Sequence, residues 1–247
     1  FSNCTSLQNF TIPPKVTKIQ HDLFNGCSSL SSIQIHDNVD TIGSFAFYNC
    51  TSLRNFTIPP KVTKISNYSF CGCRNLISIE IHDDIDWIEP WAFTNCKSLQ
   101  NFTIPPKVTE IPECIFYGCS SLTSIEIHDD IDWIGPWAFS NCTSLQNFTI
   151  PPKVTNITNS AFNGCSSLSS IQIHDDVDSI QRFAFYNCTS LRNFTIPPKV
   201  TRIEQSSFYG CRNLSSIEIH DDIDWIGPWA FSNCTSLQNF TIPPKVT

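Results

Sequence analysis

The chain repeats one pattern of apolar and polar residues every 23 positions. In the first unit, apolar residues stand at Leu7, Phe10 and Ile12 and then at Val16 and Ile19, with turn-forming residues between these short patches. The first patch predicts a short strand, and the residues after it predict an irregular return to the next strand. Because so short a unit buries almost nothing alone, its apolar side must be covered by the units before and after it.

The spacing holds along the whole chain, which predicts one domain over residues 1–247. Eleven cysteines recur every 23 residues from Cys4 to Cys234, and phenylalanine keeps the same step from Phe1 to Phe231. We expect about eleven 23-residue repeats without terminal caps, folded as a repeat solenoid. Its form is a right-handed parallel β solenoid or horseshoe with short strands and mostly irregular or 3-10 returns. Strands stacked about 4.8 Å apart predict a parallel sheet roughly 50 Å long.

Two kinds of repeat alternate, so the true unit has 46 residues. One kind contains N-F-T-I-P-P-K, as in residues 55–61, and is called the proline turn below. The other contains S-I-E-I-H-D, or the same motif with Gln for Glu, as in residues 78–83, and is called the histidine turn.

The repeated positions resemble those of BspA-type leucine-rich repeats, whose pattern is C-x-x-L-x-x-I-x-I-P-x-x-V-x-x-I-x-x-x-A-F. One copy consists of Cys50, Leu53, Phe56, Ile58, Pro59, Val62, Ile65 and Phe70. The resemblance covers the chain and implies a surface or secreted protein that adheres to host matrix or cells. The histidine turns depart from the pattern, since His36 and His82 stand where the family has proline.

Composition excludes several classes of function. The net charge of -7 and the pI near 5.2 argue against nucleic acid as a partner, because phosphate contacts need clustered Lys and Arg. No apolar run approaches the roughly 20 residues that cross a bilayer, so we expect no membrane insertion by this segment. Methionine is absent, even at position 1, so we expect a processed product or a fragment.

The 13 cysteines raise the question of disulfides or zinc. Eleven of them occupy one position per turn, where side chains point in parallel rather than at one another, so we expect reduced, buried thiols. Cys71 and Cys114 lie off this ladder and about two turns apart, which exceeds disulfide reach.

Histidines and carboxylates recur as stripes rather than as one constellation. His36, His82, His128, His174 and His220 recur every 46 residues. A structural role, in which each His ends a strand and hydrogen-bonds the next loop, is favoured over a metal-ligand or pH-sensing role. We expect no metal, no cofactor and no catalysis, because an active site needs one asymmetric group of residues and no catalytic motif occurs.

Two surfaces are candidate binding sites. The first is a small, polar strand face with Glu80, His82, Glu126, His128, Glu218 and His220. The second is an aromatic edge with Trp87, Trp91, Trp133, Trp137, Trp225 and Trp229, of which at least the first of each pair should be partly exposed. Lysines of the proline turns, such as Lys107, should pair with residues of the histidine turns, such as Asp84.

Two sets of N-glycosylation sequons are present. The N-F-T set gives the candidate sites Asn9, Asn55, Asn101, Asn147, Asn193 and Asn239 on the strand face, where glycans would compete with binding. In the N-C-T set the asparagine should bond the loop backbone instead.

The sequence therefore predicts a non-catalytic binding or adhesion module of a surface or secreted protein, with an extended rigid face for a protein or glycan partner. Two alternatives stay open: an intracellular protein-interaction scaffold in the cytoplasm, which a ladder of reduced thiols suits, and a structural solenoid that self-associates end to end.

Overall fold

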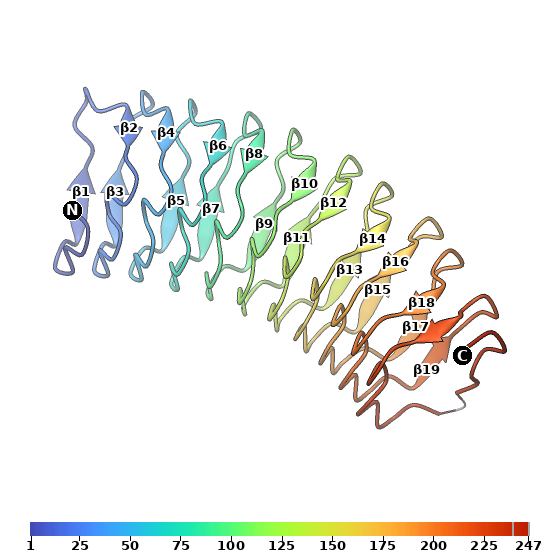
Figure 1. The fold of residues 1–247 in the computed structure, drawn as a ribbon. Helices are drawn as coiled ribbons and strands as arrows, with labels where there is room; N and C mark the ends of the chain where they lie inside the picture. The colour runs from blue at the N-terminus through green and yellow to red at the C-terminus, as the bar shows by residue number, and fades with distance from the viewer. Residues whose placement is uncertain (239, 247) are drawn as a thin grey trace.

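The computed structural model describes residues 1–238 and 240–246, and these form a curved parallel β solenoid with its termini at opposite ends (Figure 1). This confirms the predicted fold class. Each of the ten turns up to Ile226 contains one longer and one shorter strand. The longer strands are β1 (Asn9–Thr11), β3 (Ser32–Gln34), β5 (Asn55–Thr57), β7 (Ser78–Glu80), β9 (Asn101–Thr103), β11 (Ser124–Glu126), β13 (Asn147–Thr149), β15 (Ser170–Gln172), β17 (Asn193–Thr195) and β19 (Ser216–Glu218).

The shorter strands have two residues each, and their second residue points into the core. They are β2 (Lys18–Ile19), β4 (Thr41–Ile42), β6 (Lys64–Ile65), β8 (Trp87–Ile88), β10 (Glu110–Ile111), β12 (Trp133–Ile134), β14 (Asn156–Ile157), β16 (Ser179–Ile180), β18 (Arg202–Ile203) and β20 (Trp225–Ile226). Turns and irregular segments make up the return between one repeat and the next, and the described residues contain no 3-10 helix.

The longer strands form separate parallel pairs rather than one sheet, so the prediction of a continuous 50 Å sheet is wrong. Each proline turn pairs with the histidine turn after it, as β5 pairs with β7 in the register Phe56↔Ile79. Among the described residues, no strand pairing joins a histidine turn to the next proline turn. Figure 1 shows this as longer strands in twos with a wider interval between the twos. We call each wider interval a seam.

The alternation of Phe and Ile on the longer strands explains the pairing. The Phe56 ring lies 5.0 Å from that of Phe47 in its own turn and 4.8 Å from that of Phe70 in the next, so it connects the two turns. Ile79 is the equivalent residue of the histidine turn, and its shorter side chain has no aromatic ring that could contact the following turn. The histidine turn is therefore not joined to the next proline turn in the way that Phe56 joins its two turns. Ile79 is also half-buried, whereas Phe56 is only 5% exposed.

On the return side, hydrogen bonds join every turn to the next, across seams as well as within pairs. Phe47 N–H donates to the Ser69 carbonyl at 2.8 Å, and Phe70 N–H donates to the Ala92 carbonyl at 3.0 Å. The return side therefore joins the turns across the seams, whereas neither the longer nor the shorter described strands pair across them.

A stack of phenylalanine rings runs through the core. Adjacent rings from Phe24 to Phe208 have centroids 5.4–6.1 Å apart, and all these side chains are fully buried. The ladder cysteines line up beside this stack as free thiols. Nine of the eleven are buried as predicted, but Cys4 is exposed and Cys234 is half-buried, because each lies in a terminal turn that a neighbour covers on one side only. Cys73 Sγ–H, for example, donates to the Phe47 carbonyl of the preceding turn at 3.1 Å. Parallel thiols that each have a carbonyl partner are not oriented toward one another for a disulfide.

A left-handed backbone residue in each turn explains why Asn and Gly alternate before the ladder cysteine. Asn49 has φ 55° in a proline turn and Gly72 has φ 77° in the next histidine turn. A Cβ on Gly72 would overlap the Asn49 Oδ1, so only glycine leaves room for that side chain.

Candidate interaction surfaces

The first tryptophan of each predicted pair lies on a shorter strand and points outward, as expected. Trp87 is 46% exposed and Trp133 is 37% exposed, whereas Trp225 is half-buried. Each stands beside the first residue of the shorter strand before it: Trp87 beside Lys64, Trp133 beside Glu110 and Trp225 beside Arg202.

These neighbours explain the differences in exposure. The Arg202 guanidinium lies 4.4 Å from the centre of the Trp225 ring and covers it through a cation–π contact. The Lys64 ammonium instead binds the Glu89 carboxylate at 2.6 Å and leaves Trp87 bare. Trp133 has Glu110 as its neighbour, and a carboxylate is not attracted to the negative face of an aromatic ring. Glu110 therefore does not cover the Trp133 ring.

The second tryptophans have a different position, with a left-handed backbone: φ is 65° at Trp91, 54° at Trp137 and 58° at Trp229. Trp91 and Trp137 are half-buried, and the Trp91 ring stacks on Tyr68 with centroids 5.5 Å apart. Trp229 lies near the C-terminal end and is 64% exposed. Among the first tryptophans of the three pairs, Trp87 and Trp133 are thus the two exposed ones, and they lie two turns apart on the aromatic edge.

On the strand face, the candidate carboxylates bind neighbouring hydroxyls. Thr57 Oγ1–H donates to Glu80 Oε2 at 2.9 Å. The same contact, at 3.0 Å, joins Thr103 to Glu126 and Thr195 to Glu218. These bonds lie within strand pairs and leave the carboxylates at the surface.

The candidate histidines hold the fold together. His82 Nε2–H donates to the Pro59 carbonyl at 3.1 Å, and His82 Nδ1 accepts the Asp84 backbone N–H at 3.3 Å. The predicted structural contact exists, but its partner is the loop of the preceding turn rather than the next loop. The same bond joins His36 to Pro13, His128 to Pro105, His174 to Pro151 and His220 to Pro197.

Each of four seams contains a hollow that the sequence analysis did not foresee. The hollow between β7 and β9 has a volume of about 380 Å³ and is lined by residues 78–81 and 101–103. Three equivalent hollows of about 330–400 Å³ lie between β3 and β5, β11 and β13, and β15 and β17. The alternation of Phe and Ile is the signal in the sequence that could have located them.

The N-F-T asparagines lie on the strand face and line these hollows. Asn55, Asn101, Asn147 and Asn193 each belong to one hollow and are exposed, as is Asn9. Asn239 lies outside the described residues. The N-C-T asparagines are not placed as expected, by bonds to the loop backbone. Asn3, Asn49, Asn141 and Asn187 pack against the glycine of the next turn, as Asn49 does against Gly72, and Asn233 Nδ2–H donates to the Tyr209 hydroxyl at 2.7 Å.

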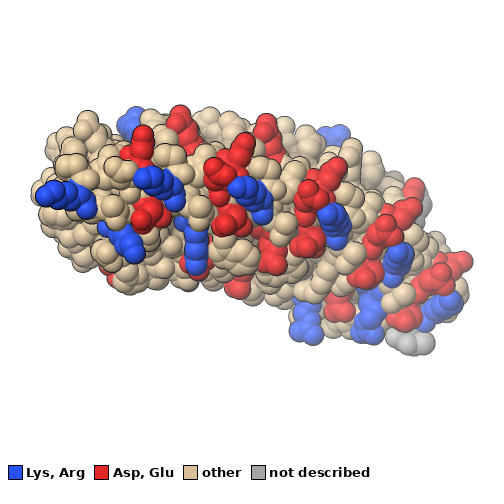
Figure 2. All heavy atoms as spheres, turned by 90° about the horizontal axis from the view of Figure 1, so that it is seen from above, with Lys and Arg blue, Asp and Glu red and all other residues tan. Residues whose placement is uncertain are grey.

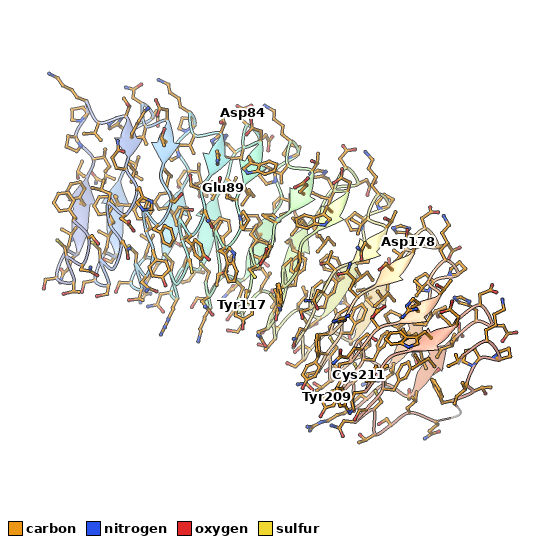
Figure 3. The ribbon with its side chains drawn as sticks, in the orientation of Figure 1. Asp84, Glu89, Tyr117, Asp178, Tyr209 and Cys211 are labelled. Atoms are coloured by element: carbon orange, nitrogen blue, oxygen red, sulfur yellow. The ribbon has the colours of Figure 1, made fainter. Side chains whose placement is uncertain are left out.

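A stripe of lysines and aspartates crosses the seams along the loop edge (Figure 2). Lys107 Nζ lies 2.6 Å from Asp84 Oδ1, which lowers the pKa of that carboxyl and raises the pKa of the lysine. Equivalent pairs are Lys153–Asp130, Lys199–Asp176 and Lys245–Asp222, while Lys61 binds Asn38. Figure 3 places Asp84 at this loop edge and Tyr117 and Tyr209 at the opposite edge. The predicted pairing between turns is confirmed.

The cysteines off the ladder are also buried. Burial raises the pKa of the Cys71 thiol to about 11 and that of the Cys114 thiol to about 12. Within residues 1–238 and 240–246, no three His, Cys, Asp or Glu side chains are placed to hold a metal ion. The described part of the chain contains no helix long and apolar enough to span a membrane.

Comparison with known proteins gives matches at the level of family and fold. A family model described as "BspA type Leucine rich repeat region (6 copies)" matches residues 1–93, 63–181 and 155–247. No curated protein matches the chain.

Among solved structures, a leucine-rich repeat protein from Bacteroides ovatus is similar over 100% of this chain and 69% of its own, with 27% identity and a TM-score of 0.82. A leucine-rich cell surface protein from Faecalibacterium prausnitzii has 26% identity and a TM-score of 0.51, over 94% of this chain and 87% of its own. The pneumococcal vaccine antigen PcpA shares the fold, with 18% identity and a TM-score of 0.66 over 97% and 73% of the two chains.

Proposed function

The chain belongs to the BspA-type leucine-rich repeat family, and from this premise we propose that it is a non-catalytic adhesion module of a surface or secreted protein. Such repeats form protein-interaction modules. The partner is a protein or glycan of host matrix or a cell surface. The exposure of Trp87 and Trp133 is the observation that carries the proposal.

Exposed tryptophans on a rigid scaffold are suited to bind a macromolecule. A tryptophan gives a large contact area with few rotatable bonds, and such residues often dominate the binding energy of an interface. Trp87 and Trp133 each stand on a shorter strand that is paired with its neighbour, so their backbone positions are fixed before binding. Little conformational entropy is therefore lost when a partner covers them.

The same repetition argues against catalysis. Glu80 and His82 have equivalents along the chain, and they are already hydrogen-bonded to Thr57 and Pro59. A catalytic base instead needs a unique place beside a nucleophile.

A location outside the cell agrees with the F. prausnitzii relative, which is a cell surface protein. The thiol ladder does not oppose it. Burial raises the pKa of Cys50 to about 12, and the thiols point in parallel, so they remain reduced even where disulfides can form.

The test is binding of the full chain to immobilised extracellular-matrix proteins, to a glycan panel and to epithelial cells, measured by surface plasmon resonance and flow cytometry. We expect Trp87→Ser with Trp133→Ser to weaken binding about thirty-fold or more, as for loss of an anchor worth about 2 kcal/mol. Trp225→Ser is the matched control, because Arg202 covers that ring. Equal binding by the double variant and the wild type would exclude the aromatic edge.

A further inference from the structure

We infer that Asn55, Asn101, Asn147 and Asn193 are N-glycan acceptors, and that the first sugar of each glycan lies in the seam hollow that its asparagine lines. The inference rests on the proposed surface or secreted location, since the transfer takes place in a secretory compartment. It selects one of the two sequon sets and gives the hollows an occupant.

Each hollow combines one sequon with the edge of the preceding histidine turn. Asn101, Phe102 and Thr103 of β9 form one wall, and Ile79, Glu80 and Ile81 form the other. The other three hollows repeat this combination with Asn55, Asn147 and Asn193. In the described residues, every hollow between a histidine turn and a proline turn on this face therefore contains one N-F-T sequon.

The chemistry of the hollow matches a pyranose ring, which has apolar C–H faces and a rim of hydroxyl groups. Ile79 and Ile81 are half-buried at the hollow and offer an apolar floor. Since β7 and β9 do not pair, the backbone N–H and C=O groups along their facing edges are available to sugar hydroxyl and acetamido groups. The volume of about 380 Å³ is at the small end of the range for ligand sites.

At two of the four acceptors, Asn55 and Asn101, a serine hydroxyl holds the asparagine amide in a suitable orientation. Ser124 Oγ–H donates to Asn101 Oδ1 at 2.6 Å, and Ser78 Oγ–H donates to Asn55 Oδ1 at 2.9 Å. Both serines belong to the turn after the asparagine. At these two positions the carbonyl oxygen is thus directed toward the next turn, and the Nδ2 that carries a glycan is directed away from it.

The N-C-T sequons have the opposite geometry. The Asn49 side chain is covered by Gly72 of the next turn, so closely that even a methyl group on Gly72 would overlap it. Asn141 and Asn187 have the same contact with Gly164 and Gly210. A sugar on these asparagines would prevent the next turn from stacking, and the chain would not fold.

The modification itself is a group transfer from a lipid diphosphate-linked oligosaccharide. A bond forms between Nδ2 and the anomeric carbon of the sugar, and the bond between that carbon and the phosphate oxygen breaks. The lipid diphosphate leaves with the electron pair, and a base of the transferase takes the amide proton.

Site occupancy is tested on the full chain purified from its native source and, separately, secreted from a eukaryotic cell line that glycosylates. Peptide N-glycosidase in H2(18)O converts each occupied asparagine to labelled aspartate, which peptide mass spectrometry locates. We expect label at Asn55, Asn101, Asn147 and Asn193 and none at Asn49, Asn141 and Asn187. Label at the second set in folded protein, or a bare first set in native secreted protein, would overturn the inference. Neither result affects the tryptophan test of adhesion.

The hollow is tested by Ile125→Phe in the secreted glycoprotein. Ile125 lines the hollow of Asn147, and the proline turn before it carries Phe102 at the equivalent position. The larger ring fills the hollow and displaces the sugar into solvent. We expect native-state cleavage by peptide N-glycosidase at Asn147 to become about tenfold faster, the factor that corresponds to about 1.4 kcal/mol. Cleavage at Asn101 is the internal control and should not change. Equal rates at Asn147 in both proteins would place the sugar outside the hollow.

Discussion

Arg202 and Trp225 come from neighbouring turns 23 residues apart, and the guanidinium lies 4.4 Å from the centre of the indole ring. This contact distinguishes Trp225 from Trp87, whose neighbour Lys64 binds Glu89 instead. A single basic residue and its choice of partner therefore decide whether a tryptophan on this side of the solenoid is available to a partner.

Replacement of the arginine should expose Trp225 in addition to Trp87, Trp133 and Trp229, which are already exposed. In Arg202→Ala the Trp225 ring loses its cover, so we expect stronger quenching of tryptophan fluorescence by acrylamide. Where a ligand is long enough to reach Trp225, it should bind more tightly. The lost cation–π contact should cost about 0.5–1 kcal/mol of stability. Arg192→Ala, on the strand side of the molecule, is the control; the same quenching in both variants would contradict this account.

The regular part of the fold could be predicted because it depends on residues that every turn repeats. Phe47, Cys50 and Leu53 recur at fixed steps, and such a repeat can bury its apolar side only by stacking. Parallel thiols and pairing of Lys107 with Asp84 follow from the same spacing, and the structure confirms both.

The seams and the exposure of individual tryptophans could not be predicted from spacing alone. A seam arises because Phe56 reaches the next turn and Ile79 does not, and that is a matter of side-chain length and packing direction. The cover over Trp225 depends on a residue one turn earlier that also has Glu204 within reach at 3.5 Å. Competition between such partners is visible only in three dimensions.

Gly72→Ala should destabilise the fold strongly, because Gly72 is buried in a tight turn. Alanine pays about 1 kcal/mol or more for the left-handed backbone at φ 77°, and its methyl group displaces Asn49. We expect a total loss of about 2 kcal/mol, measured as a lower midpoint of urea unfolding followed by circular dichroism.

A double-mutant cycle separates the two causes. Asn49→Gly removes the side chain that the methyl group meets and keeps a residue that tolerates a positive φ. Gly72→Ala should therefore cost less in the Asn49→Gly background, by about 1 kcal/mol. If the cost is the same in both backgrounds, the contact between the two turns has no energetic role.

The lysine–aspartate pairs should stabilise the fold only between acidic and strongly alkaline pH. Lys107 lowers the pKa of Asp84, so the folded state favours the carboxylate; this contribution is complete above the unfolded pKa and is lost as the pH falls through the lower, folded pKa. Asp84 raises the pKa of Lys107, so the folded state also favours the charged lysine. The stabilisation from this shift is present below the unfolded pKa of the lysine and is lost as the pH rises through the higher, folded pKa. Because both groups are exposed, the contribution is small and salt screens it.

Charge removal tests this directly. Lys107→Gln combined with Lys153→Gln and Lys199→Gln should lower the melting temperature slightly at pH 7 and low salt, and not at pH 2 or in 1 M NaCl. Lys61→Gln is a natural control, because Lys61 faces the uncharged Asn38 at 2.8 Å. A pH-dependent difference for Lys61→Gln, or none for the triple variant, would contradict the pairing.

The cysteines should be almost unreactive in the folded protein. Of the 13 thiols, Cys4 is exposed, Cys234 is half-buried and the others are buried. Burial raises the pKa of Cys50 and Cys165 to about 12, so at pH 8 they hold about a thousandfold less reactive thiolate than an ordinary cysteine. We expect an aromatic disulfide reagent to titrate one thiol quickly, a second slowly, and all 13 after denaturation.

This result would also decide how cellular location can be inferred. If the buried thiols stay free during days in oxidised glutathione, their reduced state follows from burial and parallel orientation, and it agrees equally well with a surface protein and with a cytoplasmic scaffold. Sugar on the N-F-T asparagines then becomes the observation that separates the two locations, because only a secretory route supplies it. Rapid oxidation of the ladder in the folded state would instead show that the turns open readily, and would favour the reducing cytoplasm.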